Sequence, residues 1–336
     1  MNTNDNLITN SVSNYVSVIE KIEEQKLDFI QKKCNELKEN NPQNMVEYLE
    51  GLNNDLNINH ETLISIKHIK QKSETEKKAH EKINDMIGGS VFRLFYRGVS
   101  KASFGNLPGI YRPGNKTCEY ELQQKIMAEC PQEFSDDNVD NMVKLQHYGC
   151  PTRLLDITSN PLVALYFACQ KEKHEKPEDG EVKVFAVADR RIKYQYDNEV
   201  KSISDISLYR NKNLEKAFIE KANLDKSSYM EQLKKEGVVV NKRIFDSYVF
   251  VAKKDNDRII RQGGAFFITG VFGNDTDAIK ESIDKYMIAK IKIPYEYKAS
   301  ILRSLSAICI DKKSLFPELD KIIDAYKEET IASSPK

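Results

Sequence analysis

Hydrophobic positions near the start of the chain recur at helical spacing. Between residues 15 and 37 they fall every three or four positions, and lysine and glutamate fill most of the positions between them. This pattern predicts an amphipathic helix, and two further helices are predicted over 45–52 and 61–86. We therefore expect a helical N-terminal region over residues 1–88.

The pattern changes after two consecutive glycines at 88 and 89. Residues 91–98 read VFRLFYRG, and their aromatic and β-branched content predicts a strand. Strands and helices are then interleaved without regular βαβ alternation, which favours an α+β fold. The further predicted strands are 182–188, 248–252, 265–269 and 287–293, and the predicted helices are 119–129, 161–171 and 214–236. The last helix is polar on most of its circumference, so we interpret about 205–240 as a charged helical insertion.

Composition narrows the classes of partner and compartment. Lysine and arginine together number 51 and are balanced by 51 acidic residues, so no overall field attracts nucleic acid or an anionic membrane. The polar start and the absence of an apolar run of about 18 residues predict a cytoplasmic protein without a membrane span. Six dispersed cysteines without a C-x-x-C pair, and five dispersed histidines, predict neither a disulfide framework nor a metal site.

Three segments carry polar residues inside otherwise apolar sequence. They read FYRGVS at 95–100, LQHYGCPTRLLDITSNPLVALYFA at 145–168 and RIIRQGGAFFITG at 258–270. Together they resemble the FRG domain family, whose aromatic-Arg-Gly opening is matched by Tyr96, Arg97 and Gly98. The resemblance covers about residues 89–325 and leaves 326–336 as a polar tail.

Arg97 and Gly98 are the first candidates for a binding site. A permanently charged guanidinium on an aromatic strand requires a carboxylate or a phosphate partner. Either a phosphate ligand or a structural ion pair with Asp156 or Glu121 would satisfy it. Gly98 permits the close approach of a ligand or of another backbone segment.

The central segment carries hydroxyl groups at the start of a helix. Thr158 and Ser159 precede Asn160-Pro161, which is an N-cap followed by proline at the first helical position. The hydroxyls could serve this cap. They could also contact an anion, because free backbone N–H groups converge at a helix start. Arg153 and Asp156 add charge to the same segment.

The order of these segments is similar to that of the ADP-ribosyltransferases. That resemblance implies a mixed, mainly antiparallel sheet with Arg97-Gly98 on one strand and Thr158-Ser159 on another. Where the transferases carry a glutamate, this chain has Gln262. Glutamine can hydrogen-bond a ribose hydroxyl but carries no charge to stabilise an oxocarbenium ion.

His147 and Tyr148 are further candidates for the site, His147 for proton transfer and Tyr148 for stacking. Histidine is the usual proton carrier near neutral pH, but His147 could equally support the turn that follows it. Tyr148 could stack on a base or on nicotinamide, or fill the core. Glu119 and Glu121 are two positions apart on a predicted helix, so at most one of them should point inward.

The two resemblances imply an enzyme that uses NAD as substrate, either ADP-ribosyltransferase-like or NAD-cleaving, acting as a toxin or a phage-defence effector. In this hypothesis Arg97 holds the diphosphate, Thr158 and Ser159 orient a ribose, and Gln262 contacts its hydroxyl. Glu121 or Asp156 supplies negative charge. Two alternatives stay open: a non-catalytic sensor of a nucleotide or a phage-derived ligand, and an RNA-directed toxin that uses His147 as acid and base. In each case the helical N-terminal region could bind a protein partner.

Overall fold

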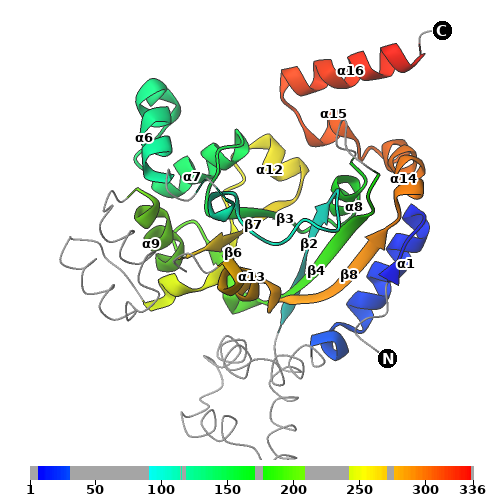
Figure 1. Ribbon diagram of the computed structural model, residues 1–336, viewed down its shortest axis with the longest axis horizontal. Coiled ribbons are helices and arrows are strands. Elements are labelled where there is room, and N and C mark those ends of the chain that lie inside the picture. Colours follow the sequence, from blue (N-terminus) through cyan, green and yellow to red (C-terminus); the bar gives the residue numbers. More distant parts are fainter. Residues whose placement is uncertain are drawn as a thin grey trace, which may run out of the picture.

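The centre of the molecule is a mixed sheet of eight strands in the order β1-β8-β4-β2-β3-β7-β6-β5 (Figure 1). The computed structural model describes residues 7–30, 91–113, 115, 119–170, 177–208, 242–270 and 276–333. The strands are β1 (Leu7–Ile8), β2 (Phe92–Val99), β3 (Leu154–Thr158), β4 (Gly180–Ala188), β5 (Ile192–Tyr194), β6 (Ser247–Val251), β7 (Gly264–Thr269) and β8 (Met287–Ile293). The two outermost pairs, β1–β8 and β5–β6, are parallel and all other pairs are antiparallel. The predicted α+β class with a mixed, mainly antiparallel sheet is therefore confirmed.

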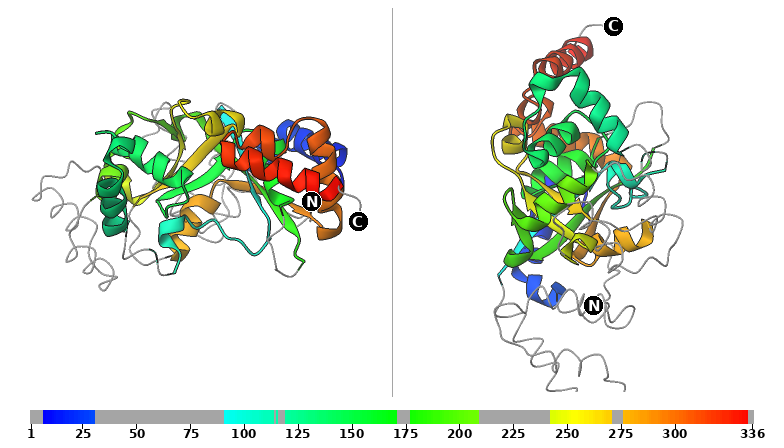
Figure 2. Two further views of the ribbon diagram at one scale, coloured as in Figure 1. Left: turned by 90° about the horizontal axis from the view of Figure 1, so that it is seen from above. Right: turned by 90° about the vertical axis from the view of Figure 1, so that its left-hand side faces the viewer.

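Helices lie around this sheet (Figures 1 and 2). The α-helices are α1 (Val12–Glu24), α6 (Glu119–Glu129), α7 (Asn138–His147), α8 (Pro161–Ala168), α9 (Asn198–Ser207), α12 (Asp257–Arg261), α13 (Thr276–Asp284), α14 (Tyr295–Ala307), α15 (Lys312–Leu315) and α16 (Leu319–Ser333). Short 3-10 helices occur at Gly109–Tyr111, Pro131–Glu133, Asp189–Arg191 and Lys242–Phe245.

The strands predicted from composition all occur, within two residues of their predicted bounds. The predicted helix 119–129 has the bounds of α6, and the predicted helix 161–171 is α8, which ends at Ala168. The predicted helices 45–52, 61–86 and 214–236 lie outside the described residues. The short edge strands β1 and β5 were not expected.

The sheet has two halves that separate between β2 and β3. β2 pairs with β4 along its whole length, and β3 pairs with β7 along all five of its residues. By contrast, Tyr96 and Thr158 form the single residue pair between β2 and β3. The polar residues of the central segment therefore lie next to a divergence in the sheet.

Helix α8 packs closely on β2 and β4 because two glycines of these strands lie beneath it. A Cβ atom built on Gly98 would lie 1.8 Å from the carbonyl oxygen of Ala164, and one on Gly180 would lie 2.1 Å from that of Ala168. The side chain of Asn160 accepts hydrogen bonds from the backbone N–H of Leu162 and Val163. The predicted N-cap is therefore confirmed, and Gly98 is required by another backbone segment.

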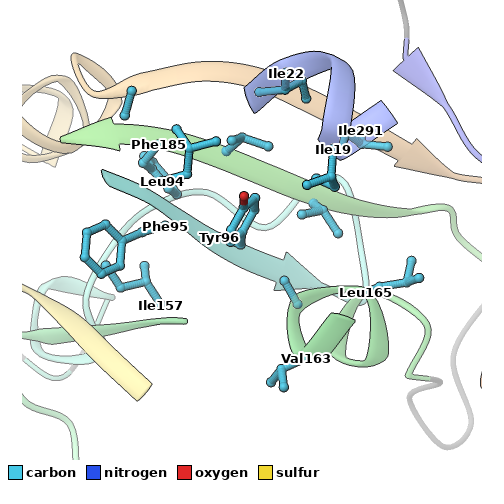
Figure 3. Close-up of a cluster of buried hydrophobic side chains, with 14 of the residues drawn as sticks. Ile19, Ile22, Leu94, Phe95, Tyr96, Ile157, Val163, Leu165, Phe185 and Ile291 are labelled. Carbon is cyan, nitrogen blue, oxygen red and sulfur yellow. The ribbon is translucent and has the colours of Figure 1, made fainter. Parts of the chain in front are cut away.

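The first described residues belong to the core, so the predicted division at residue 88 does not separate them from the sheet domain. Tyr15 is fully buried and its hydroxyl donates to the carbonyl oxygen of Pro161 at 2.9 Å. Figure 3 shows Ile19 and Ile22 of α1 directed towards the face of β2 and β4 that carries Tyr96. β1 extends the sheet by pairing with β8.

A second apolar cluster supports the other half of the sheet. It is formed by buried residues of α7, α9 and α12 against β3, β6 and β7: Val139, Met142, Leu154, Val200, Ile203, Tyr248, Phe250, Ala252, Ile259, Phe266 and Ile268. This cluster places α7 and α12 over the strands that follow the divergence (Figure 1).

Helix α16 forms the carboxyl end and projects from the body of the molecule in Figure 1 and in the right-hand view of Figure 2. This helix follows Leu315-Phe316-Pro317. It continues to Ser333, so residues 326–333 extend this helix, although a polar tail was predicted from 326. The preceding segment is anchored by Leu315, which is buried.

Candidate functional site

A small cavity of about 50 Å³ lies where α7 and α12 cover β3 and β7. Its polar lining comes from two of the three sequence segments, 145–168 and 258–270, and its apolar lining comes mainly from β7 and the adjacent helices. The lining residues are Val143, Gln146, His147, Asp156, Ile157, Arg258, Ile259, Gln262, Gly264, Ala265 and Phe266. A volume of this size admits a few water molecules or one end of a ligand. Three of the predicted catalytic residues, His147, Asp156 and Gln262, are thus brought together.

His147 ends helix α7 and has a partner at each ring nitrogen. Its Nε2 lies 2.9 Å from Oε1 of Glu318, and its Nδ1 lies 3.2 Å from Nδ2 of Asn256. Because an amide nitrogen can only donate, we assign the ring proton to Nε2, facing the carboxylate. Burial lowers the pKa of His147, and the positive charge of Arg258 lowers it further, while Glu318 opposes both effects.

Glu318 is a polar residue at this site that the sequence reasoning missed. It immediately precedes α16, and its Oε1 lies 3.7 Å from Nη1 of Arg258 as well as beside His147. Both carboxylate oxygens are buried, and apart from these ion pairs they accept no hydrogen bond from the residues that the structure describes. The signal in the sequence was its position in the LFPE segment, 315–318, which lies after the last predicted strand.

Asp156 stands at the centre of the site on β3. Its side chain accepts a hydrogen bond from Nε2 of Gln146 at 2.8 Å, and the Oε1 of Gln146 accepts one from Thr152 at 2.6 Å. These bonds fix the end of α7 against β3. The Asp156 carboxylate remains exposed, so it can contact a ligand at the cavity.

Thr158, Ser159 and Gln262 are linked through the turn between α12 and β7. The hydroxyl of Thr158 donates to the carbonyl oxygen of Gln262 at 2.6 Å, and that of Ser159 donates to the carbonyl oxygen of Gly263 at 3.2 Å. Gly263 has a φ of +54°, which favours glycine. The side chain of Gln262 donates to the carbonyl oxygen of Leu315 at 3.0 Å. The two hydroxyls therefore hold the turn that presents Gln262.

Arg97 lies at the divergence of β2 and β3 and has a backbone oxygen as its partner. Its Nη1 donates to the carbonyl oxygen of Asp156 at 2.8 Å. No carboxylate of the described residues lies within ion-pair distance, and its Nε is buried without a hydrogen bond. Desolvation lowers the pKa of Arg97 to about 10, the negative charge of Asp156 opposes that effect, and the nearby positive charge of Arg112 adds to it. The residue stays charged at neutral pH, and the predicted structural ion pair with Asp156 or Glu121 does not form.

Arg97 and Gln262 do not line the same cavity. Gly98 faces α8, so the neighbouring Arg97 faces the opposite side of the sheet, together with Lys183, its partner across β4. Gln262 bonds to the segment that contacts α8 through the ring pair Phe167–Phe316. Asp156 connects the two sides, because its carbonyl oxygen binds Arg97 and its carboxylate lines the cavity.

Arg153 is part of the framework and does not line the cavity. Its Nε and Nη2 donate to the two carboxylate oxygens of Glu119 at 2.9 and 2.5 Å, and its Nη1 donates to the hydroxyl of Tyr111 at 2.9 Å. Arg153 and Glu119 are both buried. Glu119 thus points inward and Glu121 is half-buried, in agreement with the expectation that at most one of them faces the core. Glu121 is not among the cavity residues.

Tyr96, Gly98 and Tyr148 also fall outside the cavity lining. Tyr96 is buried in the main core, where Figure 3 shows it on the face of β2 that meets α1. Gly98 lies beneath α8, as described above. Tyr148 is 75% exposed and its ring lies 4.9 Å from that of His147, so it is placed to contact a ligand that projects from the cavity.

Comparison with protein families gives one match. The FRG domain matches residues 92–177, a range that includes β2, β3, α8 and the Gln146–Asp156 part of the cavity, so this part of the chain is similar to the FRG domain. Neither the curated proteins nor the solved structures give a match.

The described ranges lack two kinds of feature. Within them, no helix has the length and apolar character needed to cross a membrane. The same ranges contain no group of three or more histidine, cysteine, aspartate or glutamate side chains placed to hold a metal ion.

Proposed function

We propose that this chain binds NAD and breaks the glycosidic bond to nicotinamide, as an ADP-ribosyltransferase-like or NAD-cleaving enzyme. In this proposal Arg97 binds the diphosphate. The exposed Asp156 carboxylate and Gln262 face the nicotinamide ribose, and Tyr148 contacts a ring of the ligand at the rim. The dinucleotide is larger than the cavity, so only one end of it enters.

The proposal rests on Arg97, which has no anionic partner among the residues that the structure describes. A guanidinium removed from water normally has an anionic partner, yet Arg97 bonds only to a backbone oxygen among the described residues. Arg112 adds a second positive charge nearby. Arginine binds phosphate oxygens with two parallel N–H groups, and the buried Nε of Arg97 has no hydrogen-bond partner among the described residues.

The proposal requires a ligand that contacts both sides of the sheet at the divergence between β2 and β3. A single residue pair, Tyr96 and Thr158, joins the two strands. Beyond that pair, the carbonyl oxygen of Asp156 accepts a hydrogen bond from Arg97, and its side chain lines the cavity. A diphosphate at Arg97 is therefore adjacent to the residue that would face the ribose.

The proposal is tested by thermal denaturation with ligands that differ in one part. NAD and ADP-ribose contain the diphosphate and should stabilise the chain, whereas nicotinamide riboside lacks it and should not. At a ligand concentration of 100 times Kd the gain is about 2.7 kcal/mol. Arg97→Met should abolish the gain.

Arg93→Met is the matched control, because Arg93 lies on the same strand and pairs with Asp189 at the surface. This variant should respond to NAD as the wild type does. Equal melting temperatures of the wild type with and without NAD and ADP-ribose would contradict the proposal. Loss of the response in both variants would show that Arg97 has no specific role.

One observation favours a second candidate, a non-catalytic sensor with the same ligand. The side-chain amide of Gln262 already donates to Leu315, and this position lacks the carboxylate found in the transferases that the chain resembles. A wild type that NAD stabilises but that releases no nicotinamide would indicate this sensor.

A further inference from the structure

The C-terminal segment is fixed against the cavity from three sides. Gln262 donates to the carbonyl oxygen of Leu315 at 3.0 Å. The ring of Phe316 packs edge-on against Phe167, with centroids 6.1 Å apart, and the guanidinium of Arg258 lies 4.8 Å from the centroid of the same ring. These contacts place the next charged residue, Glu318, at a defined position.

Glu318 meets His147 from the side opposite to Asn256. The carboxylate oxygen lies 2.9 Å from Nε2 and the Asn256 amide nitrogen lies 3.2 Å from Nδ1. Because the Asn256 amide donates to Nδ1, the ring proton is on Nε2, which faces the carboxylate, and Nδ1 keeps its lone pair. A base that a second group orients in this way is the arrangement used for proton transfer in many active sites.

We propose that Glu318 is a positioning residue that makes His147 the general base of this site. The inference rests on the proposed function. A hydroxyl group of water or of another acceptor replaces the Asn256 amide at Nδ1. As the acceptor oxygen forms its bond to C1′ of the ribose, its proton passes to Nδ1. The bond between C1′ and the nicotinamide nitrogen breaks, and its electron pair leaves with neutral nicotinamide.

Negative charge at Glu318 stabilises the imidazolium ion formed in this step. Gln262 is neutral and cannot do so, but its contact with Leu315 holds the segment that supplies the carboxylate. Gln262 is thus bonded to the backbone of Leu315, in the segment that continues to Glu318.

The test compares nicotinamide release from NAD by the full chain and by three variants. His147→Gln should lower kcat about 100-fold, the usual contribution of a general base, and Glu318→Gln should lower kcat about tenfold with little change in KM. Asp320→Asn is the matched control, because Asp320 lies two residues further on and pairs at the surface with Lys321. This control should retain wild-type kcat.

The pH profile separates a positioning role from a structural one. Activity that requires neutral His147 rises with pH through the pKa of that residue. Since Glu318 raises that pKa, Glu318→Gln should move the rising limb to lower pH, and Asp320→Asn should leave it in place.

The outcomes are distinguishable. A wild type that releases no nicotinamide overturns the proposed function and the catalytic role of Glu318 together. A wild type that is active, with a Glu318→Gln variant of unchanged kcat and pH profile, overturns this inference alone. Nuclear magnetic resonance titration of His147 checks the pair independently: its pKa should fall in Glu318→Gln, and an unchanged pKa would show that the two groups do not interact.

Discussion

Arg153→Met and Arg97→Met should have opposite effects: the first should lower stability, and the second should abolish NAD binding with little change in stability. Arg153 makes a bidentate bond to the buried carboxylate of Glu119. Arg153→Met would leave that carboxylate buried and unpaired, which costs about 3–5 kcal/mol. A domain of ordinary stability, about 5–15 kcal/mol, would lose a large fraction of it.

Arg97→Met should change the free energy of unfolding by no more than about 1 kcal/mol. The variant loses one hydrogen bond from a charged group to the carbonyl oxygen of Asp156, worth about 1.5–3 kcal/mol. It also removes the desolvation of a half-buried guanidinium, which is unfavourable in the folded state, as the fall of its pKa to about 10 shows. These two effects have opposite signs and similar size.

Urea denaturation of the wild type, Arg97→Met and Arg153→Met measures both effects, with Arg93→Met as a control for loss of a surface ion pair. We expect Arg153→Met to be far less stable, and Arg97→Met to be nearly as stable as the wild type but unresponsive to NAD. If Arg97→Met lost more than about 3 kcal/mol while Arg153→Met lost less than 1, the assignment of one arginine to binding and the other to the framework would be refuted.

Three further predictions follow from individual contacts. Gly98→Ala should destabilise the chain by about 3 kcal/mol or more, because the new Cβ would lie 1.8 Å from the backbone oxygen of Ala164 and that backbone cannot move freely; a wild-type urea midpoint would contradict this. Tyr15→Ala should cost about 3–5 kcal/mol, since it empties a fully buried site and removes the bond to Pro161; a change below 1 kcal/mol would show that α1 is not part of the core. Burial and Arg258 lower the pKa of His147, so the unfolded chain takes up this proton first as pH falls. The contribution of His147 is then fully present above its unfolded pKa of about 6.5 and decreases at lower pH. The loss of stability between pH 7.5 and 5 should therefore be smaller in His147→Gln than in the wild type.

The central strands and α8 could be predicted because their signals are local. Aromatic and β-branched runs of five to nine residues define β2, β4, β6, β7 and β8, and Asn160-Pro161 marks the start of α8 through its capping bond. β1 and β5 have two and three residues, which is too short for a period to be visible. The place of α1 in the core could not be predicted for another reason. Its apolar face indicates burial but does not indicate against which strands the helix packs.

The polar cluster was partly predictable, because the residues of one sequence segment fold next to one another. His147 and Asp156 share a motif, and Gln262 was found through the order of the segments. Glu318 lies far along the chain from His147, and only the fold brings them to 2.9 Å. Arg153 looked equivalent to Arg97 in the sequence, since both are arginines in apolar surroundings. The contacts made by each guanidinium distinguish them.

The most direct test of the proposed function is the release of nicotinamide from NAD by the purified full chain, measured by chromatography, with mass spectrometry of the protein and of added acceptors. The account predicts release by the wild type and by Arg93→Met, and loss of release in Arg97→Met although that variant remains folded. Absence of nicotinamide release from the folded wild type, with no change in its melting temperature on addition of NAD, would contradict the account.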